Sequence, residues 1–218
     1  MKIRIELTYQ TPKGIETSFN SEWLHAEKAL SIVEDFDKTG RMKHVTFIDN
    51  HETTWTLKEI KKQMEEIQTE PHNVTVYFDG GFDLKTRKSG LGCVIYYEQN
   101  KKSWRLRKNA LVEELKTNNE AEYAAFHLGL QELEYLGVHH LAVTFVGDSQ
   151  VVINQLMEEW PCYEEELTNW ADRIENHLNQ LGIEAEYELV PRKKNKEADQ
   201  LASQALREIE ITGTIEIK

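Results

Sequence analysis

The sequence predicts an α/β protein, with a mixed five-stranded sheet flanked by helices and preceded by a small α+β domain. The first observation is that apolar runs alternate with segments of helical periodicity after residue 73, in the order βββαβαα(β)α, which is typical of a mixed sheet. The second is a break near QTEPHN (Gln68–Asn73), where a helical pattern ends and a proline precedes a new strand. We therefore expect two domains, residues 1–70 and residues 71–218.

The first domain has the pattern of a self-contained α+β unit. Alternating apolar and polar residues predict strands over residues 2–10 and 14–19, with shorter strands over 45–48 and around Trp55. Helical spacing predicts two helices, the first of which is closed by Gly40. The apolar positions are Trp23, Ala26, Leu30, Val33 and Phe36 in the first helix, and Leu57, Ile60, Met64 and Ile67 in the second.

The second domain begins with three predicted strands. Val74–Phe78 is apolar almost throughout, which indicates a strand covered on both faces. Residues 90–97 and 104–110 follow as antiparallel neighbours because a short turn joins them. The later elements are predicted as helix 118–136, strand 141–146, helix 150–158, a helix ending at Gly182, strand 183–190 and a helix carrying residues 198–209.

The long helix has the clearest boundaries. Thr117 and Glu120 are spaced as a capping box, and Gly137 is placed as a stop. The strand over 183–190 alternates apolar and acidic residues, which indicates one dry and one wet face. Residues 212–218 either add an edge strand or extend freely.

Composition excludes several classes of protein. The 218 residues carry 26 basic and 38 acidic side chains, a net charge of −12, and 39% are hydrophobic, too many for a disordered acidic chain. Cys93 and Cys162 are too few for a disulfide framework and suit a reducing compartment. Since no run approaches the roughly 18 apolar residues of a membrane span, we expect a cytoplasmic protein with no membrane partner. By itself, the acidic balance argues against a nucleic-acid partner.

Four acidic residues stand where a core or a helix start is predicted. Asp79 and Asp148 directly follow apolar strands, and no Lys or Arg is adjacent to either in sequence. Glu122 and Asp199 fall one turn into two helices that would pack near the same edge of the sheet. Taken singly, each is more typical of a capping residue or of a solvated helix face than of a metal ligand. Taken together they predict a divalent metal cluster, because a buried carboxylate needs a compensating cation.

Four segments resemble, in order, the motifs of the type 1 ribonuclease H family. They are YFDGG (77–81), TNNEAEYAA (117–125), GDSQVVINQL (147–156) and NKEADQLA (195–202). A lone DGG or DSQ is unspecific, whereas four acids in order, each in its proper element, are specific. The resemblance covers roughly residues 73–206 and implies a ribonuclease H-like sheet and cleavage of the RNA strand of RNA–DNA hybrids.

The resemblance also implies roles for individual residues. Asp79, Glu122, Asp148 and Asp199 would be the catalytic ligands of two Mg²⁺ or Mn²⁺ ions, with Asp79 bridging them, Glu122 and Asp148 on one and Asp199 on the other. Contacts to the 2′-hydroxyls of the RNA strand are implied as well. The matching residues are Asn118, Asn119 and Gln150, and the backbone at Gly80 and Gly81 would allow close approach of the substrate. By themselves, the asparagines are equally typical of helix starts and the glutamine of an exposed first turn.

The sequence departs from the family pattern in two places. The loop VPRKKNKEAD has no histidine where many members carry one. Arg192 in this loop is a candidate for binding phosphate or product, and the equally open alternative is a solvated basic loop. The segment EEWPCYEEE (Glu158–Glu166) is acidic where some relatives insert a basic helix. We therefore expect phosphate contacts on the basic hairpin 101–108, through Lys101, Trp104 and Arg105.

Three functions are open at this point. The leading one is a metal-dependent endonuclease acting on RNA–DNA hybrids. The rival is a catalytically weak or inactive protein of the ribonuclease H fold that binds nucleic acid or protein, and a third is a related nuclease acting on DNA. The first domain lacks the aromatic and basic signature of a hybrid-binding module, so we assign it to homodimerisation, a protein partner or substrate extension.

Overall fold

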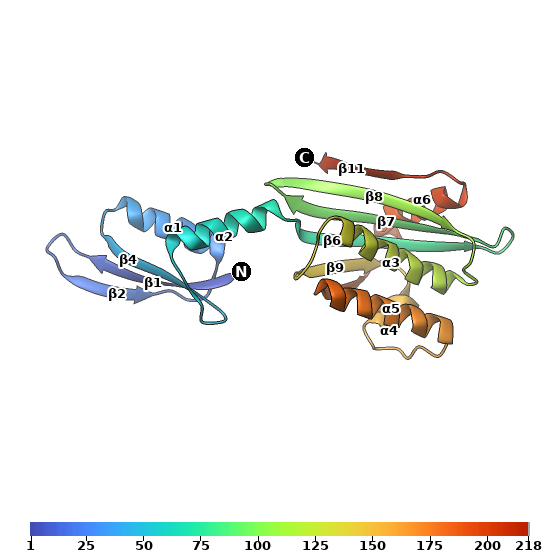
Figure 1. The fold of residues 1–218 in the computed structure, drawn as a ribbon, viewed down its shortest axis with the longest axis horizontal. Helices are drawn as coiled ribbons and strands as arrows, with labels where there is room; N and C mark the ends of the chain where they lie inside the picture. Colours follow the sequence, from blue (N-terminus) through green and yellow to red (C-terminus); the bar gives the residue numbers. More distant parts are fainter. Residues whose placement is uncertain (218) are drawn as a thin grey trace. The chain divides into compact units, whose positions relative to one another are not determined.

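The structure of the chain is a computed structural model that describes residues 1–217, apart from the side chains of residues 66–68. The chain divides into two compact units, residues 1–69 and 70–218, each with its own sheet (Figure 1). The side chain of Ile67, a predicted apolar position, lies outside the described residues. Across the described helices, none has the combination of length and apolar character that crossing a bilayer requires.

The N-terminal unit is an antiparallel sheet covered by two helices. Its elements are β1 (Lys2–Gln10), β2 (Glu16–Asn20), β3 (Leu24–His25), α1 (Ala26–Lys38), β4 (Met42–Asp49), β5 (Thr54–Trp55) and α2 (Leu57–Thr69). The strand order is β2-β1-β4-β5, with β3 also paired to β1. Ile3, Ile5 and Leu7 of β1 are buried together with Val33 of α1 and Ile60 of α2. This alternation along β1 agrees with the predicted half-buried strand.

The first helix begins later than the sequence pattern predicts. Residues 24–25 pair with the start of β1, which holds their backbone extended, so α1 starts at Ala26 and Trp23 lies outside it. The Trp23 side chain is 50% exposed, and the Arg4 guanidinium lies 5.8 Å from the centre of its ring. Trp23 is therefore a surface residue stacked with a cation, and its predicted place on a helix is wrong.

The C-terminal unit is a mixed sheet with helices on both faces. Its elements are β6 (His72–Asp83), β7 (Lys88–Gln99), β8 (Lys102–Val112), α3 (Asn118–Tyr135), β9 (Ala142–Gly147), α4 (Gln150–Leu156), α5 (Glu165–Leu181), β10 (Glu184–Leu189), a 3-10 turn (Arg192–Lys194), α6 (Lys196–Leu206) and β11 (Thr212–Ile217). The strand order is β10-β9-β6-β7-β8-β11, with β9 parallel to β6 and β10. The capping box of Thr117 and Glu120 is confirmed, and Gly137 has the left-handed conformation of a helix stop.

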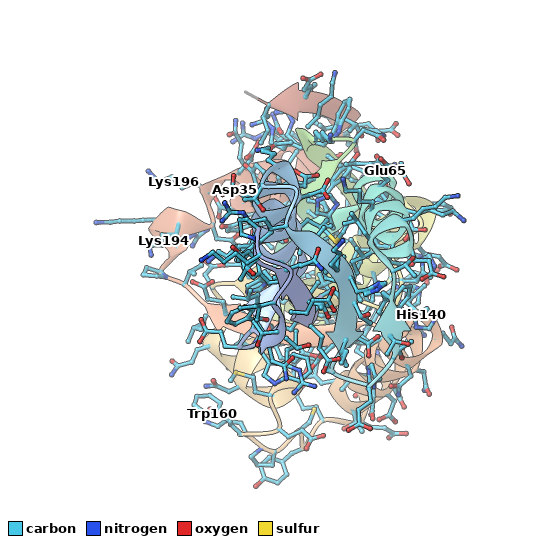
Figure 2. All side chains as sticks on the ribbon, turned by 90° about the vertical axis from the view of Figure 1, so that its left-hand side faces the viewer. Asp35, Glu65, His140, Trp160, Lys194 and Lys196 are labelled. Atoms are coloured by element: carbon cyan, nitrogen blue, oxygen red, sulfur yellow. The ribbon has the colours of Figure 1, made fainter. Side chains whose placement is uncertain are left out.

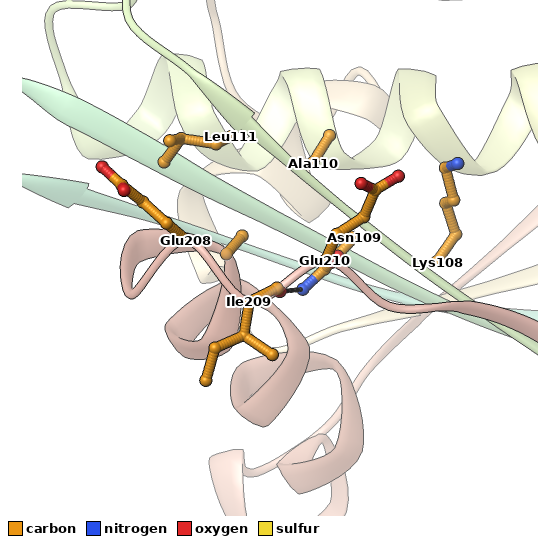
Figure 3. A pocket seen from close by; sticks show the side chains of 8 residues that line it. Lys108, Asn109, Ala110, Leu111, Glu208, Ile209 and Glu210 are labelled. Atoms are coloured by element: carbon orange, nitrogen blue, oxygen red, sulfur yellow. Dashed lines mark hydrogen bonds between the residues drawn. The ribbon is translucent and has the colours of Figure 1, made fainter.

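The sheet has six strands instead of the predicted five, because residues 212–217 pair with the free edge of β8. The turn before β11 is fixed by the buried side chain of Asn109. Its amide nitrogen donates to the carbonyl oxygens of Leu201 and Ile209 at 3.1 and 2.9 Å, and its oxygen accepts from the Ile211 backbone N–H at 2.7 Å. Figure 3 shows the bond between Asn109 and Ile209, two residues that line a surface hollow of about 510 Å³. Burial of a fully bonded amide makes β11 part of the unit.

Two helices end earlier than predicted, at Leu156 and Leu206, and both end in the same way. The next-but-one residues, Glu158 and Glu208, have left-handed φ angles of 59° and 61°. The backbone N–H groups that follow them turn back to the last helical turn, in the pattern of a Schellman motif. Glutamate occupies a position that usually favours glycine, which is why the sequence gives no stop signal there.

Candidate active site

Asp79 lies at the centre of the site, on strand β6, and is only 8% exposed. Burial raises the pKa of Asp79 to about 8, with further contributions from the negative charges of Asp148 and Asp199. Both causes make the charged form costly, since few solvent dipoles or cations offset it. The structure therefore holds a carboxyl group where a bound cation would be strongly stabilising.

Glu122 reaches the site because α3 packs directly on β6. A Cβ atom on Gly80 would lie 2.2 Å from the backbone carbonyl of Ala121, so this approach requires glycine. The Gly80 backbone N–H donates to the Glu122 carboxylate at 3.2 Å. Burial, and then the charges of Asp79 and Asp148, raise the pKa of Glu122 well above its usual value. Gly80 is predicted to allow close approach of the substrate, and in the structure it also allows α3 to pack closely on β6.

Asp148 follows β9 and is oriented by a residue that sequence reasoning missed. The Asn195 amide nitrogen donates to the Asp148 carboxylate and to the Phe78 carbonyl oxygen, both at 2.8 Å. Asn195 is 1% exposed, and its own amide oxygen is buried without a partner among the described residues. An asparagine before a helix suggests an N-cap, yet this side chain makes no capping bond. It connects the interior of β6, at Phe78, with the residue that follows β9 instead.

Asp199 comes from α6, on the opposite face of the sheet from α3 (Figure 1). A Cβ on Gly92 of β7 would lie 2.4 Å from the Ala198 carbonyl oxygen, so glycine again permits the contact. The Arg192 guanidinium forms an ion pair with the Asp199 carboxylate. Arg192 therefore lies in the site, where it neutralises one acidic residue. The glycines of β7 are the signal that could have predicted this close helix packing.

The predicted acidic residues converge on one open cleft of about 690 Å³. Ligand oxygens of Asp79, Glu122 and Asp148 lie within 4.8 Å of one another, close enough to coordinate one metal ion. Asp199 lines the cleft without belonging to this three-residue group. Clustered carboxylate oxygens fit a hard divalent cation such as Mg²⁺ or Mn²⁺, and burial of Asp79 and Glu122 adds to the need for one. The predicted residues that line the cleft are Asp79, Gly80, Gly81, Asn118, Glu122, Asp148, Arg192 and Asp199.

The other predicted substrate-binding residues do not line the cleft. Asn119 and Gln150 are each next in sequence to a lining residue, at the starts of α3 and α4. Lys101 lies in the turn between β7 and β8. The Trp104 indole donates to the Gln99 carbonyl oxygen at 3.3 Å, and Arg105 pairs with Glu197 of α6 at 3.0 Å. Any nucleic acid that contacts these residues must extend beyond the cleft.

Residues 77–205 match the reverse transcriptase-like family. The chain is 42% identical over 207 residues to the uncharacterized protein YpeP of Bacillus subtilis, which covers 94% of this chain and 91% of that protein. It is 29% identical over 133 residues to the bifunctional protein Rv2228c of Mycobacterium tuberculosis, covering 61% of this chain and 35% of that protein.

Two solved structures are similar to the C-terminal unit. RNase H1 of Halobacterium salinarum superposes with a TM-score of 0.53 at 26% identity, covering 62% of this chain and 98% of that protein. LC11-RNase H1 in complex with an RNA/DNA hybrid superposes with a TM-score of 0.56 at 25% identity, with coverage of 62% and 98%. The similarity extends over nearly the whole of each of these proteins but over less than two thirds of this chain.

Proposed function

The chain belongs to the type 1 ribonuclease H family, and we propose that it is a metal-dependent endonuclease that hydrolyses the RNA strand of RNA–DNA hybrids. The observation that carries the proposal is the convergence of Asp79, Glu122 and Asp148 within 4.8 Å in an open cleft, with Asp199 on its wall. A similar protein has been solved with an RNA/DNA hybrid, which supports the same substrate class here.

The four carboxylates have separate roles in the proposal. Asp79, Glu122 and Asp148 would hold one divalent ion, and Asp199 would help to hold a second. When bound, the ions supply an activated water and neutralise charge on the scissile phosphate. Asn195 holds the Asp148 carboxylate in place through its 2.8 Å hydrogen bond. Arg192 contacts one oxygen of the Asp199 carboxylate, Oδ1, through two guanidinium nitrogens, so a metal ion would bind this carboxylate through its other oxygen or in place of Arg192.

Substrate recognition is assigned to the rim of the cleft. Asn118 lies on the rim, and its side-chain oxygen accepts from the Phe82 backbone N–H at 3.3 Å, which orients the amide. We assign contacts with RNA 2′-hydroxyls to Asn118, Asn119 and Gln150, because this hydroxyl distinguishes RNA from DNA. Gly81, at the same rim, leaves room for the sugar-phosphate backbone.

A cleavage assay tests the proposal. The full chain is mixed with a hybrid whose RNA strand is end-labelled, in Mg²⁺, in Mn²⁺ or in a chelator, beside duplex RNA and duplex DNA. We expect metal-dependent cuts within the RNA strand of the hybrid only. Absence of cleavage with both metals, or undiminished cleavage by Asp79→Asn, would contradict it, and cleavage of duplex DNA would favour the related DNA nuclease.

A second candidate function is a ribonuclease H-fold protein with little turnover that binds nucleic acid or protein. The ion pair between Arg192 and Asp199 supports it, because a permanent pair would occupy one oxygen of a proposed metal ligand and offset its negative charge. Titration calorimetry with Mn²⁺ separates the two candidates. Uptake of Mn²⁺ that disappears in Asp79→Asn supports the nuclease, and no uptake by the wild-type chain supports the rival.

The domain division is a further part of the proposal. We assign residues 1–70 to a separate α+β domain and residues 71–218 to the ribonuclease H domain, and the clustering of contacts into residues 1–69 and 70–218 supports this. Limited proteolysis should then cut first near residue 70, in the segment between the two sheets. A homodimer or protein partner for the first domain stays a prediction.

A further inference from the structure

The negative charge of the C-terminal unit is concentrated in one segment, residues 158–188, which runs from the end of α4 through α5 and most of β10. This segment carries ten acidic residues and one basic residue, so 1 − 10 gives −9. Residues 71–218 as a whole carry 16 basic and 25 acidic residues, also −9, so the remainder balances at 15 and 15. The part of the unit that holds the carboxylate cleft is neutral, and this segment holds the whole net charge.

Within this acidic segment lies a groove with an apolar floor. It encloses about 220 Å³ between α4, α5 and β10. Glu158 and Glu175 stand at the groove together with the phenol of Tyr187. Burial, and then the charges of these two glutamates, raise the pKa of Tyr187 to about 12, which agrees with both carboxylates lying near its hydroxyl. The apolar lining residues are Leu156, Ala171, Ile174, Leu178 and Tyr187.

Two aromatic side chains are exposed on the loop between α4 and α5. Trp160 is 42% exposed and Tyr163 is 90% exposed, and Figure 2 shows Trp160 at the periphery of the molecule. The loop is anchored from within, since the Gln155 side chain accepts from the Tyr123 hydroxyl at 3.0 Å and donates to the Pro161 carbonyl at 3.3 Å. Exposed aromatic rings on an anchored loop are typical of protein-binding surfaces.

The carboxylates at the groove have no cation of their own. Among the described residues, neither Glu158 nor Glu175 forms an ion pair, and the only basic residue of the segment, Arg173, lies 4.5 Å over the Trp170 ring. Glu158 also has a left-handed backbone, with φ of 59°, which is costly for a residue with a side chain. The groove thus combines apolar walls with two carboxylates that lack a partner.

We propose that this groove is the docking site of a protein partner with a basic and apolar binding segment. An Arg or Lys side chain fits it, because the aliphatic stem can lie on the apolar floor while the cationic group lies between Glu158 and Glu175. Nucleic acid is disfavoured at this groove, because its two carboxylates and the net charge of −9 of the segment repel phosphate. The groove shares no lining residue with the carboxylate cleft, so this site is independent of the proposed nuclease.

A labelled peptide of alternating Arg and Leu tests the site on the full chain, by fluorescence anisotropy in Mg²⁺. We expect saturable binding that weakens about tenfold or more in Glu158→Gly and in Glu175→Gln, since each removes one charge-assisted contact. The matched control is Glu165→Gln, which removes the same charge from the same segment outside the groove and should weaken binding less than about twofold. The same peptide with citrulline in place of Arg should not bind.

Glu158→Gly separates loss of binding from loss of folding. Glycine adopts a φ of 59° without cost, so this variant should melt no lower than the wild type while it loses the peptide. Its hybrid cleavage, where the wild type cleaves, should be unchanged. Equal weakening in all three glutamate variants would show diffuse charge attraction and overturn the site. Absence of binding, equal binding of the citrulline peptide, or groove-dependent self-association in light scattering would overturn it as well.

Discussion

The C-terminal unit contains two groups of acidic residues, and they differ in burial more than in composition. In the cleft, Asp79 and Glu122 are buried and point toward Asp148 and Asp199, with pKa values raised by burial and mutual repulsion. In the segment 158–188, all ten acidic residues are exposed. The four carboxylates of the first group can therefore form a metal site, whereas the ten of the second mainly contribute surface charge.

The difference teaches that the surroundings of a carboxylate determine its function. Water solvates an exposed carboxylate fully, so it acts through long-range charge and is screened by salt. A buried one lacks that solvation and needs a cation or a proton. Net charge, summed over the chain, cannot distinguish these groups, which is why −12 does not exclude a nucleic-acid partner.

The largest expected difference comes from replacing one glutamate by glutamine in each of the two groups. Glu122→Gln should reduce hybrid cleavage by about 100-fold or more, as removal of one preorganised electrostatic group does. Glu165→Gln, at the exposed start of α5, should leave the rate within about twofold. Initial rates at saturating Mg²⁺ provide the measurement, and equal losses in both variants would show that burial does not separate the two groups.

The second effect tests whether Asp148 needs the hydrogen bond from Asn195 to act as a metal ligand. Asn195→Ala removes the amide that donates to this carboxylate at 2.8 Å and should lower activity or metal affinity about 10–100-fold, as loss of an outer-shell partner does. Cleavage rates over a Mg²⁺ titration, with the melting temperature as a control for folding, would measure it. A normal Mg²⁺ dependence in a folded variant would mean that Asp148 needs no such support.

The third effect is a pH dependence of stability without metal. The folded pKa of Asp79, about 8, exceeds the unfolded value of 3.8, so the folded state binds the proton more tightly. The stabilisation is present below pH 3.8 and is lost as pH rises through 8. In chelator, the melting temperature should therefore fall over this range, by roughly 2–4 °C per kcal/mol lost.

Mg²⁺ should oppose this fall in stability, because it binds the charged carboxylates of the folded state. Asp79→Asn should flatten the pH profile relative to the wild type. If this variant keeps the wild-type slope in chelator, the pH dependence belongs to ionisable groups other than Asp79.

The smallest effect is expected at a surface ion pair of the acidic segment. Lys116 lies 3.3 Å from Glu166, and both side chains are more than half exposed. Lys116→Ala should shift the melting temperature by no more than about 1–2 °C, because solvent and salt weaken exposed pairs. A much larger shift, measured by thermal melting at 0.15 M salt, would show that this group of charges is structurally important too.

Most elements and the order of the acidic residues could be predicted from the sequence. Glu122 occupies the predicted helix after its capping box, because periodicity and capping act over a few residues. Asp79 was predicted to follow a strand that ends at Phe78, but it lies within β6, because pairing with β7 continues as far as Asp83. The start of α1 was predicted too early because pairing of residues 24–25 with β1 is a contact that local patterns do not contain.

The sequence alone determined the family, the elements and which carboxylates to examine, since apolar periodicity and motif order are properties of a linear chain. Only the tertiary structure decided how these residues meet. Asn195 bridging Phe78 and Asp148, and Arg192 pairing with Asp199, depend on the distance between elements. Gly80 permits the close packing of α3 on the sheet that brings Glu122 to Asp79. Burial arises from this packing, and burial is what makes one group of acidic residues a site for chemistry and leaves the other as a charged surface.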